Sequence, residues 1–362
     1  MTSRATSQVA VLRTRPETVV EDYGRLMRLV KYDGALPRDQ DLILKLNLSW
    51  TKYFPACSSQ PWQVDGVLTT LLEDGYDRAR LFPVENRTVV TDPVEGCRNN
   101  RWSGVLARHG LPFIPLTGVE WTVHRFRSPL LRLNEIFPEG IEIPTMYVGK
   151  NVLQLPTAKV HGHTVTTGAI KNAFGGLLKE VRHYAHEFIH EVMVDLMLMQ
   201  RELHPSVFAV MDGTVMGDGA GPRTMVPRVG NLILAASDQV AIDALAARIM
   251  GFDPLAIPYL RMCHERGLGV ADPRDIEIVG DADAAALDMG FKTRRSLVIW
   301  GDQLIRRGPL RPLKRLLLHS PLVVWAPFAS NVYHDLLWYP TLGRQRIRAF
   351  SRTPWGRLFE TY

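Results

Sequence analysis

Short apolar runs alternate with stretches of helical periodicity over roughly the first 280 residues. Runs of four to eight apolar or alternating positions predict strands, and apolar residues recurring every three or four positions predict helices. The predicted strands are residues 8–12, 41–48, 78–84, 112–116, 207–211, 232–236 and 276–279, with a longer extended stretch over 141–160. The predicted helices are residues 64–72, a helix ending over 104–109, residues 181–203, and a segment that Ser237 or Asp238 caps and Gly251 ends. This alternation predicts an α/β fold with a mostly parallel, doubly wound sheet and helices on both faces.

Ligands of such sheets bind beyond the carboxyl ends of the strands. The polar side chains that directly follow predicted strands are therefore the first candidates for a site: Lys45, Asn47, Glu85, Asn86, His161, His163 and Asp212. The glycine-rich segment 212–222 follows a buried strand, and its carboxylates Asp212 and Asp218 predict contact with a cation or with a histidine. The alternative for this segment is a flexible turn.

Reactive side chains are densest between residues 159 and 176. His161 and His163 stand two positions apart on an extended stretch, so they project to the same face. Two neutral imidazoles in this arrangement predict either metal ligands or an acid/base pair near neutral pH. The alternative is a loop with two surface histidines.

A helix is predicted to start just after this pair of histidines. Thr167 and Gly168 precede the start, where free backbone N–H groups favour an anion. Lys171, with Asn172 beside it, follows one turn later and can pair with that anion. Burial would instead lower the pKa of the lysine and make it a nucleophile. A solvated lysine is the alternative.

Residues 183–191 contain three histidines, His183, His186 and His190. The stretch from His186 through Glu187 to His190 matches H-E-x-x-H, a helical zinc-hydrolase pattern in which both imidazoles share one helix face. The glycine and third histidine that continue the pattern in one class of these proteases are missing. Metal ligation for other chemistry, or a solvated polar helix face, are the alternatives.

Cysteine spacing and the N-terminus bear on location. Three cysteines, Cys57, Cys97 and Cys263, lie far apart without a C-x-x-C pair, so neither a disulfide framework nor a self-contained iron–sulfur cluster is expected. The first residues lack the apolar core of a secretory signal, and no run of about 18 apolar residues appears. These features predict a cytoplasmic protein.

Residues 283–362 differ in composition from residues 1–282, which suggests an α/β domain followed by a basic extension. The net charge of the whole chain is +6, and residues 292–362 hold 13 Lys and Arg against three acids. Four of the eight tryptophans also lie in the extension. A helical extension that packs on the body is one interpretation, and contact with an anionic membrane surface or a homodimer through residues 292–362 is another. The chain contains no nucleic-acid-binding motif known to us.

Several motifs in order resemble the domain-of-unknown-function family 362 over about residues 40–280. Where the family usually has Lys-Pro-Asn-Leu, this chain has Lys45-Leu-Asn47-Leu48. Some relatives carry cysteine-rich iron–sulfur segments that this chain lacks. The other matching stretches are His161 to Gly175, Val194-Asp195-Leu196, Met211 to Gly213 with Gly219-x-Gly221-Pro222, Ser237 to Ala244, Met250 to Pro254, and Tyr259-Leu-Arg261.

A more distant resemblance is to the N-terminal domain of nickel-pincer lactate racemases. It rests on His161 and on three residues that follow it. Thr167, Gly168 and Lys171 lie six, seven and ten positions after His161. The resemblance implies an acid/base role for His161 and a covalent cofactor anchor at Lys171. This chain departs from the pattern at Val165, where glycine is expected, and has no histidine at a matching nickel-ligand spacing.

These observations predict an enzyme that acts on a small anionic organic substrate with a metal ion or metal-containing cofactor (iron, nickel or zinc). The reaction class is an isomerase, lyase or oxidoreductase acting at carbon. Catalysis is expected from His161, His163, Lys171 and Asn172, and substrate binding from Lys45, Asn47, Thr167, Gly168, Asp212 and Asp218. The expected metal ligands are His161, His163, His183, His186, His190 and Glu187. The other class of function is a non-catalytic ligand-binding or scaffold protein peripherally associated with a membrane.

Overall fold

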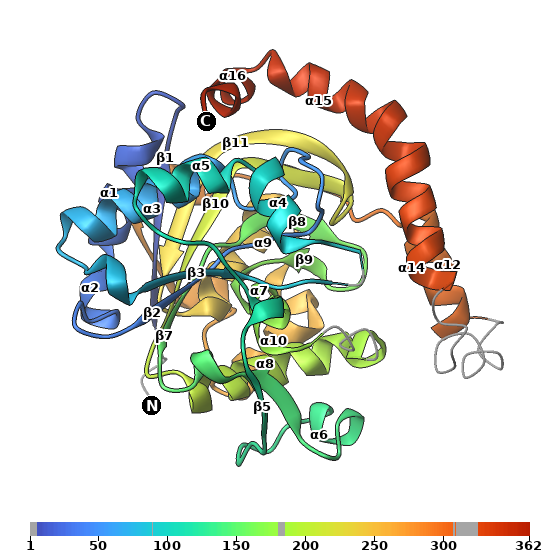
Figure 1. The fold of residues 1–362 in the computed structure, drawn as a ribbon, viewed down its shortest axis with the longest axis horizontal. Coiled ribbons are helices and arrows are strands. Elements are labelled where there is room, and N and C mark those ends of the chain that lie inside the picture. The colour runs from blue at the N-terminus through green and yellow to red at the C-terminus, as the bar shows by residue number, and fades with distance from the viewer. Residues whose placement is uncertain (1–5, 89, 180–184, 307, 309–324) are drawn as a thin grey trace.

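A ten-stranded, mostly parallel sheet forms the centre of the molecule in a computed structural model, which describes residues 6–88, 90–179, 185–306, 308 and 325–362 (Figure 1). The strands are β1 (Ser7–Arg13), β2 (Leu42–Lys45), β3 (Leu81–Glu85), β4 (Ile114–Pro115), β7 (Asn151–Gln154), β8 (Thr157–His161), β9 (Val165–Thr167), β10 (Val207–Ala220), β11 (Thr224–Ala236) and β12 (Ile276–Gly280). Their order is β12-β1-β11-β10-β7-β2-β3-β4, with β8 paired to β10 and β9. β5 (Trp121–His124) and β6 (Ile141–Pro144) form a separate pair.

Helices cover both faces of this sheet, so the predicted doubly wound α/β architecture is confirmed. One face carries α7 (Ala169–Leu177), α8 (Ile189–Leu203), α9 (Gln239–Met250) and α10 (Pro258–Glu265). The other carries α1 (Val19–Leu29), α3 (Pro61–Glu73) and α5 (Trp102–Arg108). Shorter helices are α2 (Tyr32–Ala35), α4 (Pro93–Asn99), α6 (Leu133–Ile136) and α11 (Ala282–Ala285).

Strand β1 illustrates why the strands read as continuous apolar runs. Val9 and Val11 point into the core on the α7–α10 side, whereas Ala10 and Leu12 point into the core on the α1–α3 side. A strand buried on both faces needs apolar residues at every position rather than at alternate ones.

Two sequence predictions are corrected by the structure. Residues 212–220 are not a turn, because β10 continues through them to Ala220 and pairs antiparallel with β11 as a long hairpin. Of the helix predicted over residues 181–203, residues 181–184 lie outside the described residues, residues 185–188 form a 3₁₀ turn, and α8 starts at Ile189.

The C-terminal helices pack against the body. They are α12 (Leu297–Arg306), α14 (Trp325–Asn331), the π-helical segment η9 (Val332–Gly343), α15 (Arg344–Ser351) and α16 (Pro354–Thr361). From α14 to α16 the chain arches over the β10–β11 hairpin and returns to the α3–α5 side (Figure 1). Trp338, Phe350, Trp355 and Phe359 join the core beneath α1 and α3. The extension thus completes that core, as its packing interpretation predicted.

Candidate functional site

Four segments that end at the carboxyl edge of the sheet enclose a small cavity of about 60 Å³. The loop after β2, the β7–β8 junction, the end of β8 and the β9–α7 connection meet there, with the β10–β11 turn opposite. The lining residues are Asn47, Ser49, Pro156, Thr157, His161, Thr167, Gly168, Lys171, Asn172 and Pro222. Six of these are predicted site residues at the predicted edge: Asn47, His161, Thr167, Gly168, Lys171 and Asn172.

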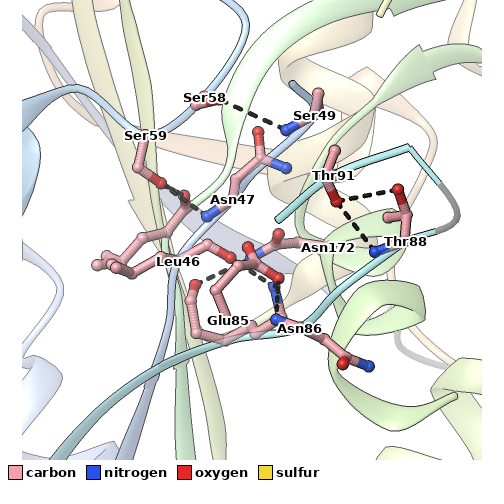
Figure 2. Close-up of polar contacts among 12 residues, drawn as sticks. Leu46, Asn47, Ser49, Ser58, Ser59, Glu85, Asn86, Thr88, Thr91 and Asn172 are labelled. Carbon is pink, nitrogen blue, oxygen red and sulfur yellow. Dashed lines mark hydrogen bonds and ion pairs between the residues drawn. The ribbon is translucent and has the colours of Figure 1, made fainter. Parts of the chain in front are cut away.

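The loop after β2 holds Asn47 in place through its backbone. Asn47 N donates to Ser59 Oγ (2.9 Å), and Ser49 N lies 3.4 Å from Ser58 Oγ (Figure 2). The Asn47 side chain faces the cavity, and its Oδ1 accepts a hydrogen bond from Lys159 Nζ at 2.6 Å. The serine-rich segment therefore presents an amide rather than a charge to the cavity.

Lys159 is the buried cation behind this amide. It is 0% exposed, and its other hydrogen-bond partner among the described residues is Thr157 O at 3.3 Å. Among the described residues, no Asp or Glu carboxylate forms an ion pair with it. Burial lowers the pKa of Lys159 to about 8.

Lys45, on the neighbouring strand, is equally buried but has a counter-ion. Its Nζ lies 2.7 Å from Glu85 Oε1, and the two side chains are 1% and 4% exposed. A Cβ on Gly176 would lie 3.1 Å from Lys45 Cε, so the glycine lets α7 pack directly on this pair. Lys45 and Glu85 support the wall of the site rather than line the cavity.

His161 ends β8 and is neutral. Its Nδ1 accepts from the backbone N–H groups of His163 (3.1 Å) and Thr164 (3.4 Å), which assigns the ring proton to Nε2. Burial, followed by the charge of Lys171, holds the pKa of His161 well below its ordinary range. The ring can donate one hydrogen bond through Nε2.

The start of α7 does not offer the predicted anion site. Asp243, from α9, accepts hydrogen bonds from Ala169 N (2.6 Å) and Ile170 N (3.2 Å). A Cβ on Gly168 would lie 2.0 Å from Asp243 Oδ1, which explains the glycine. The protein's own carboxylate thus occupies the first turn, and the predicted role of Gly168 as an anion contact is corrected to one of close packing.

Two other residues predicted beside Lys171 form part of the frame. Thr167 Oγ1 lies 3.2 Å from Lys159 O and 3.3 Å from Thr157 O, so its hydroxyl links the end of β9 to β8. Asn172 Nδ2 donates to Lys45 O (3.0 Å) and to Gln154 Oε1 (2.9 Å). The buried Asn172 Oδ1 has no hydrogen-bond partner.

The two predicted aspartates lie away from the cavity lining. Asp212 is buried within β10 and accepts from Tyr23 Oη (2.7 Å) and Trp62 Nε1 (3.1 Å). Asp218 lies further along the hairpin, where it accepts from Lys292 N at 3.0 Å. Both carboxylates therefore bind neighbouring parts of the chain.

The remaining histidines separate into two groups. The rings of His161 and His163 are 5.8 Å apart, and His186 lies 5.7 Å from His163. His190 instead stacks on Tyr259 at 6.1 Å, and Glu187 lies in the 3₁₀ turn with His186. His183 falls outside the described residues. Within the part of the chain that the structure describes, no three His, Cys, Asp or Glu side chains converge as metal ligands, so metal binding stays a prediction.

Lys159 and Asp243 are the residues whose roles the sequence analysis missed. Lys159 stands two positions before His161 on the same strand, so the alternation that pairs His161 with His163 also places Lys159 on that face. Asp243 lies in a helix distant in sequence, and nothing local shows that it caps α7.

Comparisons with known proteins identify one family and two similar proteins. A family profile described as a domain of unknown function, DUF362, matches residues 42–248. The thylakoid-associated protein sll1697 of Synechocystis is 24% identical over 272 residues, which cover 73% of this chain and 76% of that protein. A crystal structure of a Thermotoga maritima protein is 12% identical with a TM-score of 0.36, over 63% of this chain and 57% of that one. The resemblance to lactate racemases stays a prediction.

Proposed function

This chain belongs to the DUF362 family, and we propose that it is an enzyme that binds a small organic anion in the cavity around Asn47, His161 and Lys171. Lys159 is the observation that carries the proposal. A buried ammonium without a carboxylate partner costs several kcal/mol in lost hydration. An anion bound in the cavity would offset that cost.

The two buried lysines differ in whether a carboxylate is paired with the ammonium group. Lys45 is neutralised by Glu85, so a ligand is not needed to compensate its charge. Lys159 instead contacts an amide oxygen and a backbone carbonyl, which solvate an ammonium without neutralising it. Lys171 adds a second positive charge at the cavity wall. A carboxylate or a phosphate group is the ligand chemistry that suits both lysines.

Acid/base chemistry at carbon is the reaction that suits this cavity. The neutral His161 ring can polarise a substrate oxygen through its Nε2 proton. The iron, nickel or zinc predicted from the histidines would add a Lewis acid or redox centre, with His161, His163 and His186 as the nearest candidates. A non-catalytic ligand sensor would also bind an anion in this cavity, but it would not need His161 as an acid/base group.

Calorimetric titration of the full chain with oxalate tests the proposal. We expect binding by the wild type and at least a tenfold weaker binding by Lys159→Met, which keeps the length of the side chain but not its charge. Lys292→Met removes an exposed lysine and is the matched control, with affinity unchanged. Oxalate and phosphate both failing to bind the wild type, or equal affinities for wild type and Lys159→Met, would refute the anion site.

A second candidate function, peripheral attachment to an anionic membrane, is favoured by the outer surface of the C-terminal helices. Phe328, Leu336, Leu337 and Leu342 are 70%, 68%, 59% and 48% exposed. The inner side of the same segment is buried, and Arg344 and Arg348 continue its outer side. Apolar side chains bordered by basic ones suit the surface of an anionic bilayer. One relative is named thylakoid-associated.

None of the described helices is both long and apolar enough to cross a membrane. The proposal concerns attachment to the membrane surface. Co-sedimentation with vesicles of phosphatidylglycerol and phosphatidylcholine should retain the wild type and release the double variant Leu336→Gln/Leu337→Gln. Val123→Gln changes an equally exposed apolar side chain elsewhere and should stay bound. Retention of the double variant on the vesicles would exclude this surface as the membrane contact. If the wild type does not bind vesicles but self-associates, and the double variant does not self-associate, the surface would instead contact a second copy of the chain.

A further inference from the structure

A second cavity, of about 600 Å³, lies at the edge of the sheet opposite to the candidate site. Strands β1, β10 and β12 begin at this edge, and β11 ends there. The last turn of α8, the β11–α9 connection and the α10–β12 loop form its walls. Small-molecule sites in proteins have volumes of about 300–1,000 Å³. This cavity is therefore large enough for an organic ligand, and it shares no lining residue with the cavity around Asn47.

The carboxylate of Asp238 holds the walls of this second cavity together. Its Oδ1 accepts hydrogen bonds from Val240 N (2.8 Å) and Ala241 N (3.0 Å) at the start of α9. Its Oδ2 accepts from Ser7 Oγ (2.7 Å) and from Val270 N (2.9 Å) in the α10–β12 loop. These four donors are neutral, and no Lys or Arg of the described ranges forms an ion pair with Asp238. One wall therefore carries a negative charge that no basic side chain there neutralises.

The side chain next to this carboxylate has an unused hydrogen-bond acceptor. Gln239 lines the cavity and is 3% exposed. Its buried Oε1 has no hydrogen-bond partner among the described residues. A buried amide oxygen without a hydrogen bond is unfavourable, so a ligand N–H group in the cavity would stabilise it. Because Asp238 stands beside it, a positively charged N–H donor such as an ammonium is the most favourable one.

Two hydrogen-bond donors line the same cavity. Arg201, in the last turn of α8, donates from Nη2 to Gly267 O at 3.2 Å, which uses one of the five N–H groups of a guanidinium. No carboxylate in the described part of the chain forms an ion pair with it. His264 Nδ1 accepts from Ala271 N at 3.3 Å, which assigns the ring proton to Nε2. A guanidinium together with an imidazole N–H suits a carboxylate group.

The remaining walls of the second cavity include apolar side chains. Met197, Pro205, Val207, Leu268 and Val270 belong to the lining. Removing apolar surface from water on both sides of such a contact favours binding. An inorganic ion would leave these side chains and most of the volume without contact. The ligand that suits the cavity is therefore an organic molecule with an apolar portion.

We propose that this second cavity binds a free α-amino acid with a bulky apolar side chain. Its ammonium group donates to Gln239 Oε1 beside Asp238, and its carboxylate accepts from Arg201 and His264. Its side chain contacts the apolar wall. The two charges of the amino acid thus meet side chains of the opposite charge, and the unused amide oxygen gains a donor. This site is separate from the anion site proposed above and does not depend on it.

Calorimetric titration of the full chain with phenylalanine tests the proposal. Two comparison ligands each lack one of its charges: 3-phenylpropanoate has no amine, and 2-phenylethylamine has no carboxylate. We expect phenylalanine to bind at least tenfold more tightly than either of them, because both charges are recognised. Glycine, which lacks the apolar side chain, should also bind at least tenfold more weakly.

Substitutions in the lining locate the binding site. Gln239→Leu and Arg201→Met should each weaken the binding of phenylalanine at least tenfold. Arg248→Met removes an exposed arginine outside the lining and is the matched control, with affinity unchanged. Gln239→Leu removes a buried oxygen that has no hydrogen bond, so its melting temperature should equal or exceed that of the wild type. Thermal melting therefore separates loss of the ligand contact from loss of the fold.

The variant Lys159→Met distinguishes the two proposed sites. It should bind phenylalanine as the wild type does, because the two cavities share no lining residue. Loss of phenylalanine binding in Lys159→Met, with retention in Arg201→Met, would place the amino acid elsewhere and overturn the second site. The proposal also fails if phenylalanine, leucine and tryptophan all leave the wild type unbound. Equal affinities for phenylalanine and its two comparison ligands, or unchanged affinity in both lining variants, would overturn it as well.

Discussion

At the scale of single residues, the two buried lysines differ in what surrounds the charge. Lys45 is paired with Glu85, so removing either partner leaves an isolated buried charge. Lys159 is held by an amide and a carbonyl oxygen, so removing it takes away a desolvated charge rather than creating one. The buried charge of Lys159 therefore lowers the stability of the fold while it serves ligand binding, as expected of a residue kept for function.

The substitution of methionine for each lysine should show this difference. Lys45→Met is expected to lower the free energy of unfolding by about 3–5 kcal/mol, because Glu85 is left buried without its partner. Lys159→Met is expected to be as stable as the wild type or more stable. Urea denaturation followed by circular dichroism measures both. Equal destabilisation by the two substitutions would contradict the interpretation of Lys159 as a buried charge without a directly paired carboxylate.

The pH dependence of stability provides a second test at this residue. Burial lowers the pKa of Lys159 to about 8, whereas the ordinary value is 10.5. Between these values the unfolded chain binds more protons than the folded chain, so the stability of the wild type rises with pH. Relative to Lys159→Met, the wild type should gain about 2 kcal/mol from pH 7 to pH 9.5. Urea denaturation at both pH values measures it, and a difference independent of pH would place Lys159 in an exposed setting.

At the scale of elements, helix α7 is fixed by a carboxylate from another helix. Gly168→Ala would place a Cβ 2.0 Å from Asp243 Oδ1, so we expect a loss of about 1–3 kcal/mol in the free energy of unfolding. Gly34→Ala is the control, because no heavy atom lies within 4 Å of the new Cβ. Thermal and urea denaturation of the pair measure the effect. A stable Gly168→Ala protein would contradict the capping role of Asp243.

Elements whose residues interact locally are the ones that the sequence predicted well. The helix α9 is an example, because Asp238 accepts from Val240 N and Ala241 N, and Gly251 adopts a left-handed φ of 101°. The β10–β11 hairpin was not predicted, since Gly213, Gly217 and Gly219 are typical of a turn. A Cβ on Gly213 would lie 2.5 Å from Leu232 Cδ1, a contact across the hairpin that a sequence does not reveal.

The residues of the candidate site likewise include some whose position the sequence predicted and some whose position it did not. Asn47, His161 and Lys171 follow predicted strands or start a predicted helix, so the topology of a parallel sheet places them at one edge. Asp212 also follows the residues predicted as a strand, but the strand continues and buries it against Tyr23 and Trp62. The anion contact predicted at Gly168 failed because Asp243 arrives from a helix about 70 residues away.

At the scale of the whole molecule, the C-terminal helices form part of the core. Trp355 is 1% exposed, packs on Trp62 with ring centroids 5.1 Å apart, and donates to Asn231 Oδ1 at 2.7 Å. The final helix thereby joins α3 to the β11 strand. Composition predicted a distinct extension, and a shift in composition does not reveal which aromatic residues face the body.

Truncating this tryptophan should destabilise the whole molecule. Trp355→Ala is expected to lower the free energy of unfolding by about 3–5 kcal/mol, whereas Trp300→Ala, at a side chain 52% exposed, should change it by less than about 0.5 kcal/mol. Urea denaturation monitored by near-ultraviolet circular dichroism measures both. A loss below about 1 kcal/mol at Trp355 would mean that the last helix folds independently of the body.

The central claim is that an anion occupies the cavity beside Lys159. A crystal structure of the wild-type protein grown with oxalate tests it most directly, because the electron density locates the ligand independently of any activity. We predict a carboxylate in the cavity within hydrogen-bonding distance, about 2.7–2.9 Å, of the Lys159 or Lys171 amine. A cavity that holds only water at saturating oxalate, or oxalate bound only at another surface, would contradict the account.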